Sequence, residues 1–307
     1  MTETGLLVMS YGTARGLDDV EAYYTHVRRG RPPSPEALQE LRGRYEAIGG
    51  RSPLIEITED QVRGLEKELN SSGLQVRAYH GMKHQHPYIE DAVRQMSDHG
   101  VGAAIGLVLA PHYSRFSVGE YVERATKMAE ELGVKTTFVK SYHDDPAFVR
   151  FIASRVGDAL AKVTEEDATQ TPVVFSAHSL PVRILESGDD YPGELQRTAD
   201  AVARELGHSE YLTAWQSAGR TGEEWLGPDL TDVLSDLASA GHRAAVSCPV
   251  GFVSDHLEVL YDIDIEAQDA ARAAGLQLVR TESPNADPEF LGALAGVVRE
   301  HLSREGW

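Results

Sequence analysis

Short apolar runs alternate with longer stretches of helical pattern along almost the whole sequence. The apolar runs lie at 5–10, 75–79, 103–110 and 136–139, and again at 172–176, 211–215, 243–248 and 276–280. This alternation is typical of βαβ units, in which parallel strands form a sheet that helices cover on both faces. Because each half contains four such runs, we predict two α/β domains, at 1–144 and 145–286. The last helix, about 287–307, is expected to pack back on the first domain.

The net charge limits the kinds of molecule that the protein is expected to bind. The 307 residues include 48 acidic and 29 basic side chains, which gives a net charge of −19. Nucleic acids and anionic lipids are bound first by clustered Lys and Arg, so neither is expected as a general partner. The N-terminal residues lack a basic segment, and no run reaches the roughly 18 apolar residues of a membrane span. We therefore expect a cytoplasmic protein that is not integral to a membrane.

Cysteine usage and the absent motifs exclude several kinds of site. Cys248 is the only cysteine, so one chain can form neither a disulfide nor a cysteine-based zinc or iron–sulfur site. Neither a Gly-x-Gly-x-x-Gly motif after the first strand nor a P-loop motif is present, which disfavours nucleotide binding. The Gly-x-Ser-x-Gly motif of α/β hydrolases is also absent.

Three acidic residues follow the strand at 243–248. Glu258, Asp262 and Glu266 are spaced i, i+4, i+8, so an α-helix predicted over 254–273 would carry them as one stripe. Like charges at this spacing destabilise a helix by a few tenths of a kcal/mol per pair, roughly. The stripe therefore predicts either a solvated helix face or a site for a cation.

Polar residues follow the first strand of each half. Tyr11 follows the run 5–10 and His178 follows the run 172–176, and Pro111 precedes Glu120 by the same nine residues that separate Pro249 from Glu258. These likenesses fit an internal duplication or coincidence. Ligands bind outside the carboxyl ends of parallel strands, so Tyr11 and His178 would face one cleft under the first alternative. A histidine there is either a proton acceptor and metal ligand or an ordinary side chain.

Arginines gather in the segment 28–51. It contains six arginines and three glutamates within a strongly acidic chain. Guanidinium groups bind carboxylates and phosphates in bidentate fashion, so the segment predicts either an anion site or surface helices with many ion pairs. Ser34 followed by Pro35 predicts one helix start, and the capping-box pattern at 58–61 predicts the next helix to begin at Thr58.

Several segments, taken together, resemble the ferrochelatases. The resemblance rests on 176–181, 215–217, 225–228 and 249–264, and for the soluble bacterial branch that acts on coproporphyrin III on 11–13, 23–31, 44–50, 52–54 and 81–84. It spans nearly the whole chain. It implies two Rossmann-like, chelatase-type α/β domains, each a mainly parallel sheet flanked by helices, with the active-site cleft between them.

The resemblance also implies the reaction. A lyase of this kind inserts Fe²⁺, a substrate, into coproporphyrin III, forms coproheme for haem biosynthesis and releases two pyrrole protons. His178, Glu258 and Tyr11 match the family's catalytic and metal-contacting residues, and Asp262 and Glu266 match its acidic metal path. An imidazole with an ordinary pKa of about 6.5 suits a proton acceptor near neutral pH. The side from which iron enters, that of His178 or that of Tyr11, is open.

Further positions match contacts to the porphyrin. These are Thr13, Arg28, Arg44, Tyr45, Ser52, Lys83, Tyr121 and Ser217. The four propionates of coproporphyrin suit an arginine-rich rim. Because Cys248 stands alone, the [2Fe–2S] cluster of some relatives is not expected. The charged lip at 28–31 favours the soluble branch, for which we expect a monomer that hands coproheme transiently to the next haem-pathway enzyme.

Two other functions fit the same residues. One is insertion of iron into protoporphyrin IX, and the other, from a different class, is a non-catalytic carrier of haem or coproheme. The pairing of His178 with Glu258 favours an enzyme, because a carrier needs no proton acceptor.

Overall fold

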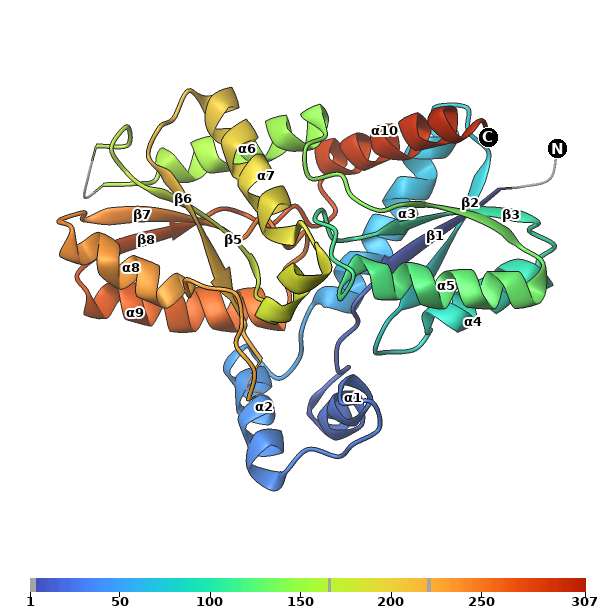
Figure 1. Cartoon of the computed structure of the whole chain (residues 1–307), viewed down its shortest axis with the longest axis horizontal. Coiled ribbons are helices and arrows are strands. Elements are labelled where there is room, and N and C mark those ends of the chain that lie inside the picture. The colour runs from blue at the N-terminus through green and yellow to red at the C-terminus, as the bar shows by residue number, and fades with distance from the viewer. Residues whose placement is uncertain (1–3, 165–166, 220–221) are drawn as a thin grey trace.

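The computed structural model describes residues 4–164, 167–219 and 222–307. Within these ranges the chain forms two four-stranded parallel sheets that lie side by side (Figure 1). The first sheet consists of β1 Thr4–Ser10, β2 Val76–Met82, β3 Ala103–Val108 and β4 Lys135–Val139. The second consists of β5 Val173–His178, β6 Tyr211–Gln216, β7 Ala244–Cys248 and β8 Gln277–Arg280. The α/β fold predicted from the alternating pattern is confirmed.

Helices cover both faces of each sheet, as the buried apolar strands require. In the first half these are α3 Leu54–Ser71, α4 Ile89–Asp98 and α5 Val118–Leu132. In the second half they are α6 Pro146–Leu160, α7 Tyr191–Leu206, α8 Leu230–Ser239 and α9 Gln268–Ala273. The final helix, α10 Pro288–Glu305, contacts α3, α6 and β4. Two helices, α1 Val20–Val27 and α2 Pro35–Ala47, project from the rest of the molecule beneath the two sheets (Figure 1).

The two sheets have the same topology. Their strand orders are β2-β1-β3-β4 and β6-β5-β7-β8, and all pairs are parallel. The first strand of each half, β1 or β5, therefore lies inside its sheet at the point where the strand order reverses. Ligands bind beyond the carboxyl ends of strands at such points. Tyr11 and His178 stand at these equivalent places, as the likeness between the halves predicts.

The largest apolar core joins the two halves. Leu6 and Ile105 of the first sheet, Phe175 and Val246 of the second, and Phe290 of α10 all belong to one cluster of buried side chains. Burial of this shared surface stabilises the two sheets against each other. The domain bounds given above stay a prediction.

The two helix starts predicted near the arginine segment had different outcomes. The Ser34 side chain accepts a hydrogen bond from the Ala37 amide, 3.3 Å away, and Pro35 is the first residue of α2. The prediction that the next helix begins at Thr58 is wrong, because α3 begins at Leu54 and Thr58 lies inside it. The Ser52 hydroxyl accepts a 3.4 Å hydrogen bond from the Leu54 amide instead, while Thr58 and Gln61 are fully buried. The capping-box pattern was misleading because both polar residues are buried in the interior of α3 and neither caps its start.

The helix predicted over 254–273 is not a single α-helix. The segment Val259–Ala267 is π-helical and continues into α9. A π-helix has a wider turn, closed by i→i+5 bonds, and such segments are frequent at functional sites. Residues four apart consequently lie slightly less than a turn apart, so the stripe of Glu258, Asp262 and Glu266 winds gradually around the helix.

No helix in the described part of the chain combines the length and the apolar character that crossing a bilayer requires.

Candidate active site

Residues that follow different strands converge on one cavity. His178 ends β5, Tyr11 follows β1 and Lys83 follows β2, and all three line a cavity of about 330 Å³. Tyr121, in the first turn of α5, lines it as well. The cavity is mostly apolar with a few polar groups, which is the usual character of a site for a small organic ligand.

The loop after β7 brings Glu258 to the same cavity. Its Gly251 amide donates a 3.0 Å hydrogen bond to the Ser176 carbonyl of β5. A Cβ at Gly251 would lie 2.5 Å from the Cβ of Ala177, so only glycine permits this close approach of loop and strand. The approach places the start of the π-helical segment beside the end of β5. The sequence-distant residues His178 and Glu258 thereby become neighbours.

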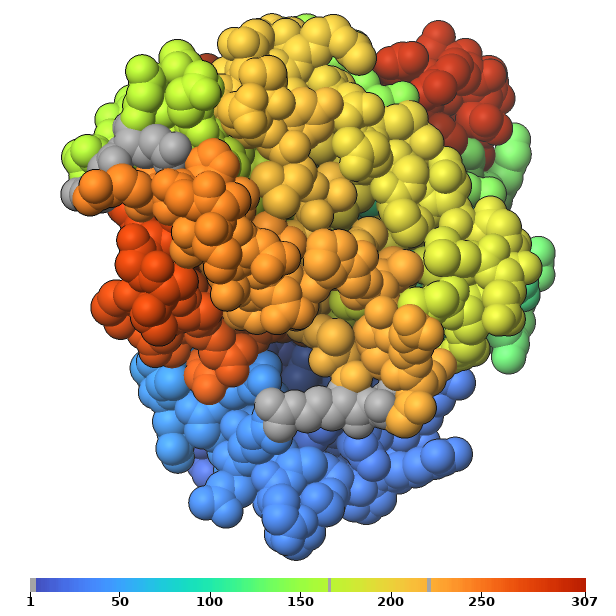
Figure 2. All heavy atoms as spheres, turned by 60° about the vertical axis from the view of Figure 1, so that its left-hand side comes forward, coloured from blue at the N-terminus to red at the C-terminus, as the bar shows by residue number. Residues whose placement is uncertain are grey.

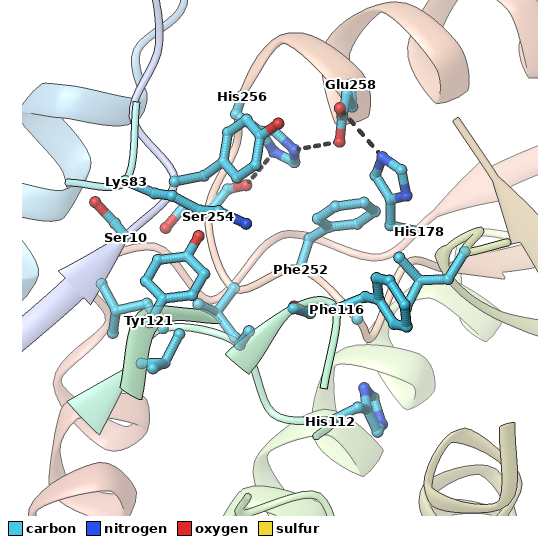
Figure 3. Close-up of a pocket in the computed structure, with 18 of the residues that line it drawn as sticks. Ser10, Lys83, His112, Phe116, Tyr121, His178, Phe252, Ser254, His256 and Glu258 are labelled. Atoms are coloured by element: carbon cyan, nitrogen blue, oxygen red, sulfur yellow. Dashed lines mark hydrogen bonds and ion pairs between the residues drawn. The ribbon is translucent and has the colours of Figure 1, made fainter. Parts of the chain in front are cut away.

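Glu258 lies between two imidazoles. Its Oε1 is 3.5 Å from His178 Nε2, and its Oε2 is 3.3 Å from His256 Nε2. Figure 3 shows both rings directed at the carboxylate from opposite sides. The Nδ1 atoms of His178 and His256 lie at hydrogen-bond distance from the backbone carbonyls of Ser179 and Ser254, which fixes the orientation of the rings.

These contacts shift the ionisation of the pair. Burial lowers the pKa of His178, but the Glu258 carboxylate and the hydrogen bonds at both ring nitrogens outweigh burial and raise that pKa to about 9. Burial opposes ionisation of Glu258, yet His178 and His256 hold the pKa of the carboxyl well below its ordinary range. At neutral pH the pair is therefore an imidazolium beside a carboxylate. Strongly perturbed pKa values in a cleft are characteristic of functional sites.

The other two acids of the stripe line an adjoining cavity of about 240 Å³ together with Glu258, Arg44 and Ser217. Asp262 accepts hydrogen bonds from the Ser217 hydroxyl and, at 3.0 Å, from the Arg44 guanidinium. Burial raises the pKa of Asp262 to about 6, and the charge of Glu258 adds to this effect. Figure 2 shows the surface hollowed between the α2 segment and the segment that contains Ser217. The acidic stripe thus lies in a cavity that leads from Glu258.

The opposite wall of the main cavity contains Tyr11, Lys83 and Tyr121. The Lys83 ammonium lies 5.8 Å from the ring centroid of Tyr11 and 5.2 Å from that of Tyr121, which are cation–π distances. Tyr11 is 40% exposed. Its enclosure by the cleft walls, together with the charges of Glu258 and Glu120, raises the pKa of Tyr11 well above 10, so the phenol is neutral at neutral pH.

Four predicted contact residues lie outside the two cavities. The hydroxyls of Thr13 and Tyr45 are 2.7 Å apart and buried against each other. The Arg28 guanidinium lies 5.6 Å from the ring centroid of Tyr24, on α1. Ser52 is buried and lies two residues before α3, where its hydroxyl accepts a hydrogen bond from the Leu54 amide. The structure therefore brings Tyr11, Lys83, Tyr121, His178 and Glu258 together in one cavity, and Arg44, Ser217, Asp262 and Glu266 in the other, with Glu258 in both.

Two residues of this site were not predicted. His256 contacts Glu258, and Glu120 forms an ion pair with Lys83 at 2.5 Å. Glu120 was conspicuous in sequence only through its spacing from Pro111, which repeats the spacing of Glu258 from Pro249. His256 lies two residues before Glu258, and no periodicity marks it because the chain there is not yet helical.

Within the described ranges, no three His, Cys, Asp or Glu side chains are grouped closely enough to hold one metal ion. Glu258, Asp262 and Glu266 lie in succession along one helical segment and line the same adjoining cavity.

Comparison with known proteins places these observations in context. The ferrochelatase family profile matches residues 3–302. The chain is 49% identical over 306 residues to coproporphyrin III ferrochelatase of Anoxybacillus flavithermus, covering 98% of this chain and 97% of the relative. It is also 49% identical over 304 residues to coproporphyrin III ferrochelatase of Bacillus subtilis, covering 98% of each.

Among solved structures, SirB from Bacillus subtilis with Fe³⁺ superposes with a TM-score of 0.62 at 14% identity and covers 99% of this chain and 97% of SirB. The cobalt complex of the sirohydrochlorin chelatase SirB from the subspecies spizizenii gives a TM-score of 0.61 at 12% identity, covering the same shares. At this identity the likeness establishes the fold: two parallel sheets flanked by helices.

Proposed function

We infer that this chain, which belongs to the ferrochelatase family, inserts Fe²⁺ into coproporphyrin III to form coproheme in haem biosynthesis. The inference is carried by one observation, the 47–49% identity over 98% of the chain to four coproporphyrin III ferrochelatases. The reaction is balanced by loss of protons: Fe²⁺ replaces two pyrrole N–H protons, and no electron is transferred. The enzyme must therefore supply a route for a divalent cation and acceptors for two protons.

The pair of His178 and Glu258 fits the role of proton acceptor. At neutral pH His178 holds a proton because Glu258 is ionised beside it. A divalent cation that reaches Glu258 offsets the negative charge that raises the pKa of His178, so the imidazole then loses its proton more readily. Arrival of iron thus prepares His178 as the base that takes a pyrrole proton, and Glu258 passes protons or holds the metal at the same point.

Asp262 and Glu266 fit the approach for iron. They line the cavity that shares Glu258 with the main cleft, and carboxylate oxygens suit a hard divalent cation. Arg44 partly neutralises Asp262, which limits how tightly the path holds the ion. Iron is a substrate and has to be released to the porphyrin. A series of weak carboxylate contacts therefore suits its transfer better than one site that binds the ion tightly.

On the other face, Tyr11 is the residue we assign to contact iron in coproheme. To ligate as a phenolate it must first lose its proton, which its raised pKa opposes until the cation is adjacent. We assign the propionates to Arg28, Arg44, Thr13, Tyr45, Ser52, Lys83, Tyr121 and Ser217. For Thr13 and Tyr45 this requires that their mutual hydrogen bond opens when the substrate enters.

The remaining assignments follow from the composition of the chain and the resemblance described above. Cys248 is 2% exposed, and burial raises the pKa of its thiol to about 12, which suits a packed side chain rather than a cluster ligand. We propose that the enzyme works as a monomer in the cytoplasm without an iron–sulfur cluster. Transient transfer of coproheme to the next haem-pathway enzyme completes the proposal.

Anaerobic assays with Fe²⁺ test the substrate. The kcat/KM for coproporphyrin III is expected to exceed that for protoporphyrin IX, because the latter lacks two of the four carboxylates that the polar rim can bind. A clear preference for protoporphyrin IX would overturn the assignment. Binding of coproheme with no turnover of either porphyrin would identify a carrier instead.

A further inference from the structure

Lys83 occupies an unusual position for an ammonium group. Its side chain extends from the end of β2 into the main cavity above the Tyr121 ring (Figure 3) and is only 11% exposed. An ammonium group taken out of water has to be paired, because its desolvation costs several kcal/mol, roughly. In the structure its partner is the Glu120 carboxylate, whose Oε2 lies 2.5 Å from Nζ.

Glu120 holds a second cation as well. Its Oε1 lies 3.5 Å from a guanidinium nitrogen of Arg29, which is 86% exposed and belongs to the charged lip after α1. Arg29 has a φ of 56°, a conformation that non-glycine residues rarely adopt. One carboxylate therefore joins a cation inside the cavity to a cation at its rim.

The surroundings of Glu120 leave it room to move. It lines an outer groove with Phe116, Glu123 and Arg183, and Phe116 also lines the main cavity, so the two spaces share a wall. Glu120 is 30% exposed, compared with 11% for Lys83. The carboxylate can turn outward into water at small cost, whereas the ammonium cannot leave the cavity as easily.

We propose that Glu120 occupies the place of a substrate carboxylate at Lys83 and gives that place up when the substrate binds. This rests on the proposed function, in which the ligand is a porphyrin that carries several carboxylates. The exchange keeps Lys83 paired throughout, so the buried ammonium is never left without a counter-ion. Glu120 therefore competes with the carboxylates of both the substrate and coproheme for Lys83. The competition lowers the affinity for both ligands and speeds release of the product. Glu120 is in this sense an affinity-setting residue that acts through Lys83.

Metal-free binding of coproporphyrin III, followed by its absorbance and fluorescence, tests the proposal. Glu120→Gln is expected to lower the Kd about three- to fivefold, a factor that corresponds to the free energy of a partly exposed ion pair. Dissociation of coproheme is expected to slow by a similar factor. Glu123→Gln is the matched control: it removes the same charge from the same groove, but Glu123 is exposed and makes no ion pair within the described residues. Its Kd is expected to stay that of the wild type.

A shorter acidic side chain at position 120 distinguishes the effect of the contact with Lys83 from the effect of the negative charge. Glu120→Asp keeps the charge but withdraws the carboxylate from Lys83, so it is also expected to tighten binding, though less than Glu120→Gln. The proposal is overturned if Glu120→Gln and Glu123→Gln change the Kd equally, if Glu120→Asp binds like the wild type, or if Glu120→Gln binds more weakly. Iron insertion by the wild type is assayed separately. A wild type that binds porphyrin without metallating it would refute the proposed function while leaving these comparisons valid.

Discussion

His178 Nε2 lies 3.5 Å from Glu258 Oε1, although the two residues belong to segments that are 80 positions apart. The contact depends on the approach of the Gly251 loop to the end of β5, and therefore on the adjacency of β5 and β7 in the second sheet. A pair built in this way joins an imidazolium to a carboxylate inside the cleft. Its ionisation should be detectable in the stability of the ligand-free protein.

The first prediction concerns pH. The pKa of His178 is raised to about 9 in the folded state from an ordinary value of 6.5, so the stability from its protonated form is fully present below about 6.5 and is lost as pH rises through about 9. The lowered pKa of Glu258 has its effect at the acid side, where stability is lost as pH falls below the ordinary value of 4.5.

Denaturant unfolding of the wild type and of His178→Asn measures this effect. The free energy of unfolding of the wild type should fall relative to the variant between pH 6.5 and pH 9.5, while contributions from the other groups cancel in the difference. Parallel curves over that range would refute the assigned ionisation of the pair.

The second prediction concerns the acidic path. Asp262→Asn combined with Glu266→Gln should raise the KM for Fe²⁺ by about tenfold, the effect of 1.4 kcal/mol, and change the KM for coproporphyrin III much less. The reason is that both carboxylates are assigned to the path of iron, whereas none of the residues assigned to the propionates is an acid. Asp269→Asn serves as the control, because Asp269 pairs with Arg272 at an exposed position on α9. Equal changes in both KM values would argue against a metal path.

The third prediction concerns the buried polar residues of α3. The Gln61 side-chain amide donates to the carbonyls of Val253 and Asn285 at 3.1 and 2.8 Å, and its oxygen accepts from the Ser254 hydroxyl at 3.1 Å. Gln61→Leu leaves these groups buried without partners and should destabilise the protein by about 2–4 kcal/mol. It should also lower activity, since the 253–254 segment leads directly to Glu258.

Thr58 provides the contrast within the same helix. Its hydroxyl is buried, and in the described part of the chain it has no hydrogen-bond partner. Thr58→Val removes an unsatisfied polar atom at nearly constant volume, so the stability should be unchanged or slightly higher. Thermal or chemical unfolding of the two variants tests the pair, and a loss of stability in Thr58→Val as large as in Gln61→Leu would show that the burial argument is wrong.

Local pattern in the sequence accounts for only part of the fold and of the site. The alternation of strands and helices, the Ser34 cap and the placement of Tyr11 and His178 near strand ends depend on local pattern, and the structure agrees with them, although His178 is the last residue of β5 and does not follow it. Thr58 and Gln61 imitate a capping box, but both are buried inside α3, and Gln61 bonds to Val253 and Ser254, which lie 192 and 193 positions away. No local pattern reveals these two partners. His256 contacts Glu258 from only two positions away, but the chain there is not yet helical, so no periodicity marks this residue.

The residues that we assign to the propionates show a second limit of the sequence. Thr13 and Tyr45 match the family's substrate contacts, yet here their hydroxyls bond to each other in the buried core around α1 and α2. A resemblance identifies the residue type, whereas the hydrogen bonds that each side chain forms become visible only in the structure.

The central claim is that His178 accepts a pyrrole proton during iron insertion. The direct measurement is anaerobic coproheme formation by His178→Ala, together with the Kd of metal-free coproporphyrin III for the same variant. Loss of a general base predicts a fall in kcat of at least about 10²-fold with a nearly unchanged Kd. Coproheme formation at a rate near that of the wild type would contradict the account.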